Sequence, residues 1–198
     1  MKRLIFSLLI MLIPSMAFAQ TANWITADDS TRNDRNVWIE FHKEFVLKKN
    51  IKKAEAKIAA DSKYWLWING EMVVFEGGLK RGPNRNDTYY DVVDLASYLK
   101  KGKNDIKVLL WHFGKSGFSH NSSGKSGMII DAPAISLRTD KSWLSQRLDC
   151  YQMADKPRPN YRLSEANIRY DARLEDQEWL KPSLEIGKWG DQPWGNLI

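Results

Sequence analysis

Histidine is the side chain best suited to catalysis or metal binding, and this chain contains three, His42, His112 and His120. Their separations do not match a metal site, in which ligands recur a few residues apart, so no metal and no cofactor are predicted. His112 continues an alternating apolar stretch and is predicted to be buried. His120 lies among serines and beside Asn121, and such hydroxyl and amide groups suit a network around sugar hydroxyls. A loop ordered for structural reasons alone is the simpler interpretation of the same residues.

The acidic residues do not form a recognisable catalytic pair. A glycosidase needs two carboxyl groups that face each other across a cleft, one of them with a raised pKa. The candidate pairs, Asp171 with Glu175 and Asp176 with Glu178, all lie in one charged run, which is typical of a solvated surface. The single cysteine, Cys150, has no neighbouring base and no CxxC partner, so a structural thiol is expected. No catalytic residue is predicted.

Basic residues accompany two glycine-rich stretches, 77–84 and 114–127. The first lacks the G-x-x-x-x-G-K-[ST] spacing of a phosphate-binding loop and does not open a helix, so phosphate binding is rejected. Lys80 and Arg81 can instead bind the carboxylate of an acidic sugar or, as the favoured use, a neighbouring domain. Both stretches are expected to leave one end of a rigid β scaffold, where recognition residues commonly lie. The residues expected to cluster there, against a glycan or a domain, are Lys80, Arg81, Lys115, His120 and Asn121.

The segment 61–99 contains the clearest structural signal. Asn69-Gly70 suits a type I′ turn, because both central positions need φ > 0, and it predicts a hairpin of Lys63–Ile68 with Glu71–Phe75. Both faces of the first strand are apolar, so the hairpin lies inside a two-layer sandwich or carries an aromatic binding surface. The predicted faces are Tyr64, Leu66 and Ile68 against Trp65 and Trp67. The strand tryptophans Trp65, Trp67 and Trp111 are expected to pack in the core.

Further alternating stretches complete the predicted fold. They indicate strands at residues 37–47, 51–60, 89–94, 106–113, 128–131 and 134–139, with one helical turn at residues 95–101. Many short strands, long loops and almost no helical periodicity are typical of all-β proteins. The sequence therefore predicts an antiparallel β-sandwich of the jelly-roll kind with an irregular C-terminal extension.

The domain organisation is predicted from shifts in composition. Residues 1–19 have the positive start, the apolar run and the small-x-small end of a signal peptide. The run falls short of the roughly 20 residues of a membrane span, so we expect export to the periplasm or outside a bacterial cell; an uncleaved anchor is the alternative. Residues 20–140 are expected to form the sandwich. Residues 141–198, with prolines and tryptophans in polar sequence, are expected to be an extension or the start of a truncated module.

Composition limits the possible partners. The formal charge of +6 falls to +4 without Lys2 and Arg3, and the basic residues are scattered among acidic ones, which disfavours nucleic acid. A single cysteine excludes an intrachain disulfide, so the hydrophobic core must hold the fold. Nine tryptophans supply aromatic faces that stack on sugar rings as well as filling cores. No nucleic acid and no membrane span are expected.

Four segments resemble the N-terminal region of bacterial α-L-rhamnosidases: YWLWINGEMV, GGLKRGPN, DTYYDVVDLASYLKKGKNDIKVLLW and FGKSGFSHNSSGKSG. The pattern around Asp94-Leu95 is shared more widely by galactose-binding-like jelly-roll domains, whereas the glycine-rich segments are more specific. The resemblance implies a large modular inverting glycoside hydrolase, in which β-sandwiches precede an (α/α)-barrel with the catalytic acid and base. No catalytic motif of that family matches a position in this chain, so none is assigned.

The resemblance therefore implies the non-catalytic N-terminal part of a secreted α-L-rhamnosidase-like enzyme that acts on rhamnose-containing plant or bacterial glycans. Its partner would be such a glycan or a catalytic barrel absent from this chain. A free-standing carbohydrate-binding module is the alternative, and a structural or interaction module is a third possibility.

Overall fold

The computed structural model describes residues 22–28, 34–79, 86–118, 120–157, 160, 162–175 and 180–198. The expected signal peptide, the Lys80-Arg81 pair and the acidic pair Asp176 with Glu178 lie outside these residues. In the part of the chain that is described, no helix is long and apolar enough to cross a membrane.

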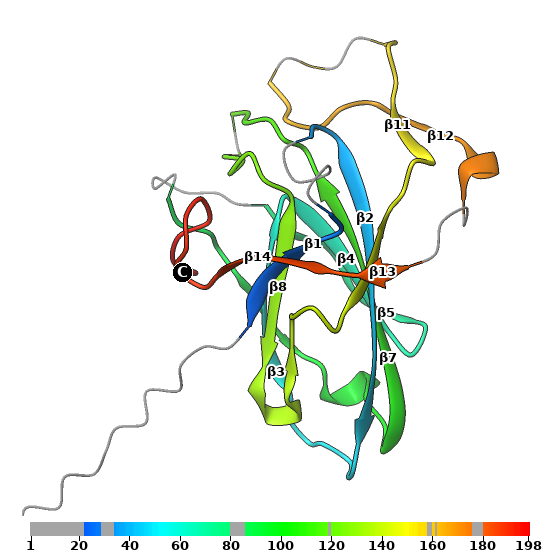
Figure 1. The fold of residues 1–198 in the computed structure, drawn as a ribbon, viewed down its shortest axis with the longest axis vertical. Coiled ribbons are helices and arrows are strands. Elements are labelled where there is room, and N and C mark those ends of the chain that lie inside the picture. Colours follow the sequence, from blue (N-terminus) through cyan, green and yellow to red (C-terminus); the bar gives the residue numbers. More distant parts are fainter. Residues whose placement is uncertain are drawn as a thin grey trace, which may run out of the picture.

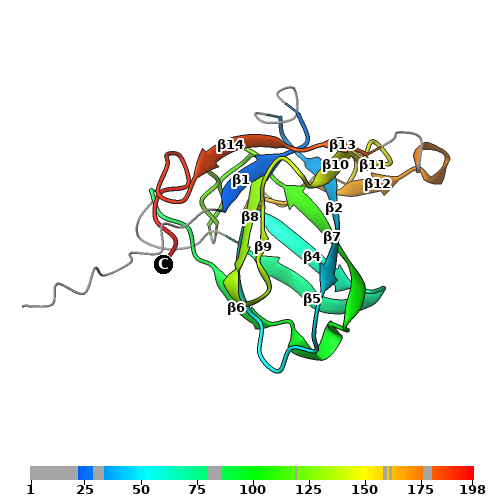
Figure 2. The ribbon, with the colours of Figure 1, turned by 60° about the horizontal axis from the view of Figure 1, so that its bottom comes forward.

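Two antiparallel β-sheets pack face to face as a sandwich (Figures 1 and 2). The first sheet contains β1 (Asn23–Thr26), β3 (Glu55–Asp61), β6 (Asp91–Asp94), β8 (Gly127–Ala132), β9 (Leu137–Arg138) and β14 (Leu184–Lys188). The second contains β2 (Val37–Leu47), β4 (Lys63–Ile68), β5 (Glu71–Gly78), β7 (Gly102–His112), β10 (Leu144–Arg147) and β13 (Lys181–Pro182). A separate pair is formed by β11 (Tyr151–Met153) and β12 (Ile168–Tyr170), and the short 3₁₀ turns are η1 (Ala96–Tyr98), η2 (Pro133–Ile135) and η3 (Ala172–Leu174). The predicted all-β sandwich is confirmed.

The order of strands explains how the chain closes. The first sheet runs β14-β1-β8-β3-β6, with β9 paired to β8, and the second runs β13-β10-β2-β7-β4-β5. β2 and β7 form the longest ladder, from Val37 opposite His112 to Leu47 opposite Gly102. Because β3 and β7 both end, and β4 and β8 both begin, at the same end of the sandwich, several loops meet there. We call it the loop end; it is uppermost in Figure 1.

The central hairpin has the predicted turn. Asn69 and Gly70 have φ values of 52° and 81°, as a type I′ turn requires. β4 pairs with β5 on one side and β7 on the other. Of the two predicted faces of β4, the one that lies inside the sandwich and is fully buried consists of Tyr64, Leu66 and Ile68.

The main core lies between the two sheets, and strand alternation supplies it. Its fully or almost fully buried side chains include Ile25, Ile39, Phe41, Ala56, Ile58, Leu66, Ile106, Val108, Leu110 and Ile130. A second, smaller cluster lies on the outer face of the first sheet, made of Ala22, Trp24, Ala59, Ile129, Trp194 and Leu197.

Three expectations differ from the structure. Trp65, Trp67 and Trp111 are not core residues; they lie half-buried on the outer face of the second sheet, because period two points them away from the inner residues. The stretch expected as a strand at 134–139 is instead η2 followed by the two-residue β9, because Pro133 opens a turn and Ser136 has a left-handed φ of 54°. The strand expected at 89–94 is shortened to β6.

Residues beyond 140 extend both sheets at one side, so that β13 and β14 are edge strands. β10 pairs with β2 and β13 with β10 in the second sheet, while β14 pairs with β1 in the first. None of these strands was predicted from the sequence. Trp143 is fully buried and donates its Nε1–H to the carbonyl of Arg138 at 2.7 Å. The last residues fold back on the first sheet, where Thr88 bridges to Leu197.

Candidate functional site

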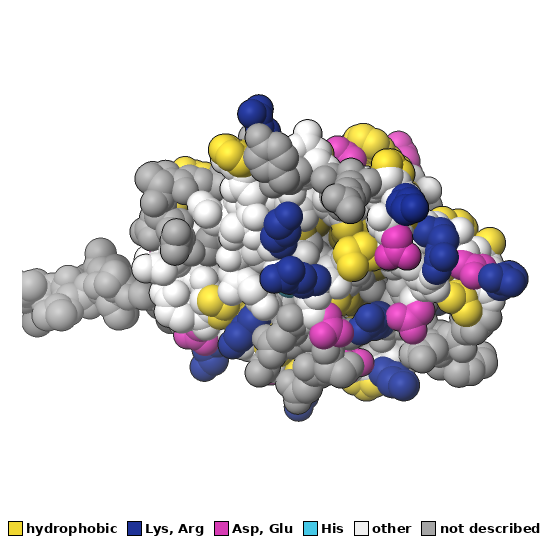
Figure 3. All heavy atoms as spheres, turned by 90° about the horizontal axis from the view of Figure 1, so that it is seen from above, with side chains coloured by type: hydrophobic (Ala, Val, Ile, Leu, Met, Phe, Trp, Pro, Cys, Tyr) yellow, Lys and Arg dark blue, Asp and Glu magenta, His cyan; other side chains and the backbone are white. Residues whose placement is uncertain are grey.

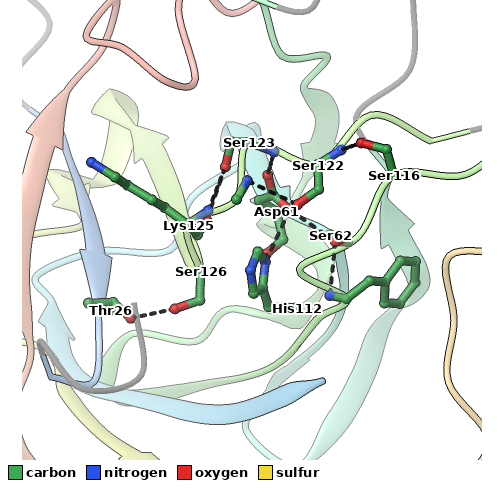
Figure 4. Close-up of polar contacts among 11 residues, drawn as sticks. Thr26, Asp61, Ser62, His112, Ser116, Ser122, Ser123, Lys125 and Ser126 are labelled. Atoms are coloured by element: carbon green, nitrogen blue, oxygen red, sulfur yellow. Dashed lines mark hydrogen bonds and ion pairs between the residues drawn. The ribbon is translucent and has the colours of Figure 1, made fainter. Parts of the chain in front are cut away.

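The loop between β7 and β8, residues 113–126, crosses the loop end and is anchored by one buried carboxylate (Figure 4). Asp61, the last residue of β3, is fully buried. Its Oδ2 accepts the backbone N–H of Ser123 at 2.5 Å, and its Oδ1 accepts the Ser122 hydroxyl at 3.2 Å. Ser62 adds a third donor to Oδ1 at 3.0 Å. The glycine- and serine-rich loop is thus tied to the sheet through its own polar groups.

His112, the last residue of β7, completes this anchor from the neighbouring sheet. Its Nδ1 lies 2.8 Å from the Asp61 carbonyl and 3.1 Å from the Asp61 carboxylate, and the ring is fully buried, as predicted. Burial alone would raise the pKa of Asp61, but the interactions with His112 and Ser123 outweigh it and hold that pKa well below the ordinary 3.8. Asp61 is therefore a buried, ionised and fully hydrogen-bonded anchor.

The same residues do not form a nucleophilic triad, although they include aspartate, histidine and serine. In a triad the serine hydroxyl bonds to the histidine nitrogen that faces away from the aspartate. Here Ser62 and Ser122 donate to Asp61 itself, and His112 Nε2 is buried with no hydrogen-bond partner among the described residues. The cluster can hold a loop but does not activate a serine.

The first glycine-rich stretch begins beside this anchor. The Leu79 N–H donates to the Ser62 carbonyl at 2.6 Å, and Gly78 N–H and the Tyr64 hydroxyl both donate to Asp91 Oδ2, at 2.9 and 2.8 Å. Burial and the neighbouring Asp91 raise the pKa of Tyr64. A Cβ at Gly77 would lie 2.5 Å from the Tyr64 ring, so only glycine fits there. Described residues of both glycine-rich stretches are therefore hydrogen-bonded to Asp61 or Ser62.

The structure describes three of the five predicted site residues. Lys115 is exposed, Asn121 is half-buried, and His120 is buried with its ring edge-on to Phe113 at 5.3 Å. Lys80 and Arg81 lie outside the described residues, so the clustering of all five stays a prediction. Figure 3 views the loop end and shows Lys and Arg side chains near Asp and Glu side chains, with hydrophobic side chains between them.

A continuous series of aromatic rings extends from this loop across the outer face of the second sheet. The successive ring pairs are His120–Phe113 at 5.3 Å, Phe113–Trp111 at 4.8 Å, Trp111–Trp38 at 4.6 Å and Trp38–Tyr151 at 4.3 Å. Trp38 also stacks with Trp65 at 5.7 Å. Sequence reasoning did not single out Trp38 or Tyr151, yet the alternation of β2 places Trp38 on the same outward face as Trp111, directly opposite it.

The described residues between 148 and 175, called the arm below, dock on this aromatic surface through β11 and β12. The Leu148 N–H donates to the Trp38 carbonyl at 2.8 Å, and Tyr151 stacks on the Trp38 ring. The arm also contacts the β7–β8 loop, where Phe118 N–H donates to the Arg162 carbonyl at 3.3 Å. Cys150, which directly precedes β11, is buried, and this burial raises the pKa of its thiol, as expected of a structural residue.

The remaining candidates have structural surroundings. His42 Nε2 bonds to Asp105 at 2.7 Å across the β2–β7 ladder. Asp171 accepts both guanidinium and backbone N–H groups of Arg173, which lower the pKa of Asp171 to about 2. No group of three or more metal-ligating side chains occurs within the described ranges. The arrangement offers hydroxyls, amides and aromatic surfaces on a fixed scaffold, which is the chemistry of sugar recognition.

The described residues define an antiparallel β-sandwich whose loops meet at one end. No protein-family model and no curated protein match the sequence. Among solved structures, the chain is similar to the GH78 family rhamnosidase of Bacillus sp. GL1, with 29% identity and a TM-score of 0.72 over 90% of this chain and 19% of that one. The α-L-rhamnosidase from Aspergillus terreus matches with 22% identity and a TM-score of 0.58, over 84% of this chain and 21% of that one.

A lectin from Pleurotus ostreatus, solved in complex with GalNAc, shares the fold at 16% identity and a TM-score of 0.53, over 89% of this chain and 46% of that one. The chain spans about a fifth of the length of the rhamnosidases it matches. It therefore matches the β-sandwich region of GH78 α-L-rhamnosidases, as the resemblance in the sequence predicted.

Proposed function

We propose that this chain is a non-catalytic, glycan-binding β-sandwich of an exported α-L-rhamnosidase-like glycoside hydrolase that acts on rhamnose-containing glycans. The observation that carries the proposal is the similarity to a GH78 rhamnosidase over nine-tenths of this chain at 29% identity. The shared fold of a lectin solved with GalNAc supports glycan binding by this type of sandwich.

The loop end is the proposed recognition surface. The β7–β8 loop presents Lys115 and Asn121 and is held by the buried Asp61, so binding would not require the loop to be ordered first. The aromatic series beside it supplies flat apolar surfaces of the kind that pack on sugar rings. Lys80 and Arg81 belong to the same proposal, with a neighbouring domain as their favoured contact.

Calorimetry on the purified chain tests this function. Titration with rhamnose-containing oligosaccharides should give weak but saturable binding, and a rhamnose-free galactan of equal length should bind more weakly. An aryl rhamnoside should not be hydrolysed by this chain. Silent titrations with all rhamnosylated polymers would contradict the proposal, as would rhamnoside turnover that one carboxylate substitution in this chain abolishes.

Similarity to the lectin supports a second candidate, a free-standing carbohydrate-binding module. The two functions differ in their partner, because only the first requires a catalytic barrel. A rhamnosidase barrel added in trans should bind this chain, and Arg81→Ala should weaken the complex without lowering the melting temperature. Glycan binding without any affinity for such a barrel would favour the free-standing module.

Export is part of the proposal and has its own test. Cleavage before Gln20 should leave Gln20 as the first residue of the exported protein, which N-terminal sequencing of the periplasmic or extracellular fraction would detect. An intact N-terminus in the cytoplasmic fraction alone would contradict it.

A further inference from the structure

A cleft of about 530 Å³ lies between the arm and the residues that lead into β2. Charged, amide, aromatic and apolar side chains line it: Arg35, Asn36, Arg147, Asp149, Tyr151, Gln152, Met153 and Leu174. Its volume falls within the roughly 300–1,000 Å³ range of small-molecule sites. We infer that this cleft is a subsite for one neutral sugar residue, separate from the β7–β8 loop. The inference rests on the glycan-binding function proposed above and locates a place for it.

The aromatic side of the cleft is Tyr151, and its position is fixed. The ring stacks on Trp38 with an interplanar angle of 18°, and Trp38 stacks in turn on Trp111. Tyr151 is half-buried, whereas Trp38 beneath it is 6% exposed. Tyr151 is therefore the ring of this stack that a ligand in the cleft can reach. The C–H face of a pyranose packs on such a rigid ring without an ordering cost.

Polar groups of the cleft are also held in place before a ligand arrives. Arg147 donates from Nη1 to Asp34 at 2.8 Å and from Nε to Asp149 at 3.0 Å. A guanidinium beside a carboxylate offers a donor and an acceptor in one plane, which matches two adjacent sugar hydroxyls. Arg35 also lines the cleft, so two guanidinium groups balance the carboxylates of Asp34 and Asp149, and this balance favours hydroxyls over a charged ligand.

Asn36 supplies a further donor. Its Oδ1 accepts the Trp111 Nε1–H at 2.9 Å, which fixes the orientation of the amide. Within the described part of the chain, its Nδ2 makes no hydrogen bond. The residue has a φ of 53°, a left-handed conformation that asparagine adopts more readily than most residues. Asn36 thus links the aromatic stack to the cleft and leaves an amide N–H₂ for a ligand.

The apolar residues of the cleft indicate what kind of sugar it takes. Met153 of β11 and Leu174 of η3 also line the cleft, and their side chains are apolar, unlike those of Arg147 and Asp149. A sugar with hydroxyls on one edge and a methyl group on another, such as a 6-deoxyhexose, satisfies both kinds of lining. We therefore expect a neutral deoxyhexoside to bind better than a uronate.

Asn36→Asp is the sharpest test, because aspartate keeps an acceptor for Trp111 and tolerates the same backbone conformation, while a negatively charged oxygen replaces the Nδ2 donor. In ligand-observed NMR titrations, methyl α-L-rhamnoside should bind the Asn36→Asp chain about tenfold more weakly, as expected for loss of one hydrogen bond. Tyr151→Ala should have at least the same effect, whereas Tyr151→Phe should stay within about twofold because it keeps the stack.

Lys53→Ala is the matched control, since Lys53 is exposed and precedes β3 at the end opposite Asp61. It should bind like the unchanged chain, and melting temperatures should show that Asn36→Asp and Tyr151→Phe are folded. If the unchanged chain binds glycans and the Asn36→Asp and Tyr151→Ala chains bind them as tightly, the cleft is not the sugar subsite, and the proposed function stands. If the unchanged chain binds no glycan, both the sugar subsite and the proposed glycan-binding function are wrong. Tighter binding of methyl galacturonate than of the rhamnoside would overturn the preference for a neutral sugar.

Discussion

The outer faces of the two sheets each carry a pair of stacked tryptophans, with different consequences. On the first sheet, Trp24 and Trp194 stack at 4.6 Å with an interplanar angle of 12°. On the second, Trp38 and Trp111 stack at 4.6 Å and 15°. The ring geometry is almost the same, yet the first pair is fully buried and Trp111 in the second is half-buried.

The difference lies in what covers each pair. Trp24 and Trp194 are enclosed by Ala22, Ala59 and Ile129, and backbone hydrogen bonds between Thr88 and the C-terminal residues close this cluster. Trp38 is covered by Tyr151 from an arm that lines a cleft with both polar and apolar side chains. A stack of almost the same geometry thus forms a second core where an apolar cluster encloses it, and lies beneath a cleft with polar groups where the arm covers it.

Trp194→Ala should have the largest effect on stability. It opens a cavity in a closed apolar cluster, and such substitutions cost about 3–5 kcal/mol. Urea unfolding should show the loss, while glycan affinity per folded molecule should not change. Trp194→Phe is the control, since it keeps a ring in place and removes an Nε1–H that has no partner among the described residues. A loss below about 1 kcal/mol for Trp194→Ala would contradict a second core.

Asp61→Asn should rank next, with a loss of about 3 kcal/mol, because it breaks a buried charged network by changing one partner. Asp105→Asn is the matched control: it also removes a carboxylate bonded to a histidine, but Asp105 is 40% exposed, so about 1 kcal/mol or less is expected. Equal losses for the two variants, measured by urea unfolding, would contradict the anchoring role.

The same anchor predicts a dependence on acid. Folding lowers the pKa of Asp61 below 3.8, so the unfolded chain takes up this proton first as the pH falls. The stability that Asp61 contributes is present above pH 3.8 and is lost as the pH falls toward the lower native value. Unfolding of the unchanged chain should therefore be more acid-sensitive than that of Asp61→Asn, measured by denaturation between pH 5 and 2. If the stability of both chains fell with pH at the same rate, Asp61 would not be the source of the acid sensitivity.

Tyr151→Ala should lower global stability by about 1–2 kcal/mol, less than Trp194→Ala or Asp61→Asn, because the ring is half-buried and covers one face of the stack. Its main consequence should be local: limited proteolysis should cut the arm sooner, leaving the sandwich intact. Tyr151→Phe should protect the arm as well as tyrosine does. Global unfolding of Tyr151→Ala would show that the arm belongs to the core, like the cover of the first sheet.

Local signals in the sequence predicted the part of the fold that depends on neighbours in the chain. Asn69-Gly70 defines its hairpin by itself, and the long alternation of β2 and β7 identifies their inner faces. The strands β10, β13 and β14 have two to five residues, which is too short to show an alternating pattern in the sequence. They form because each pairs with a neighbouring strand.

The candidate site was predictable only in part for a similar reason. The polar loop with Lys115 and Asn121 is visible from composition. The pairing of Asp61 with His112 joins residues 51 positions apart, and the contact of Trp38 with Tyr151 depends on how the arm folds back. The outward placement of Trp65 and Trp111 follows from alternation, but whether an outer face is covered depends on residues beyond 140.

The central claim is that the outer face of the second sheet takes part in glycan recognition while that of the first is purely structural. The indole N–H signals of a ¹H–¹⁵N NMR titration with a rhamnose-containing oligosaccharide test it in one experiment. The Trp111 signal, whose N–H is bonded to Asn36, should shift and saturate, while those of Trp24 and Trp194 stay in place. Shifts confined to Trp24 and Trp194, or no shift at any tryptophan, would contradict the account.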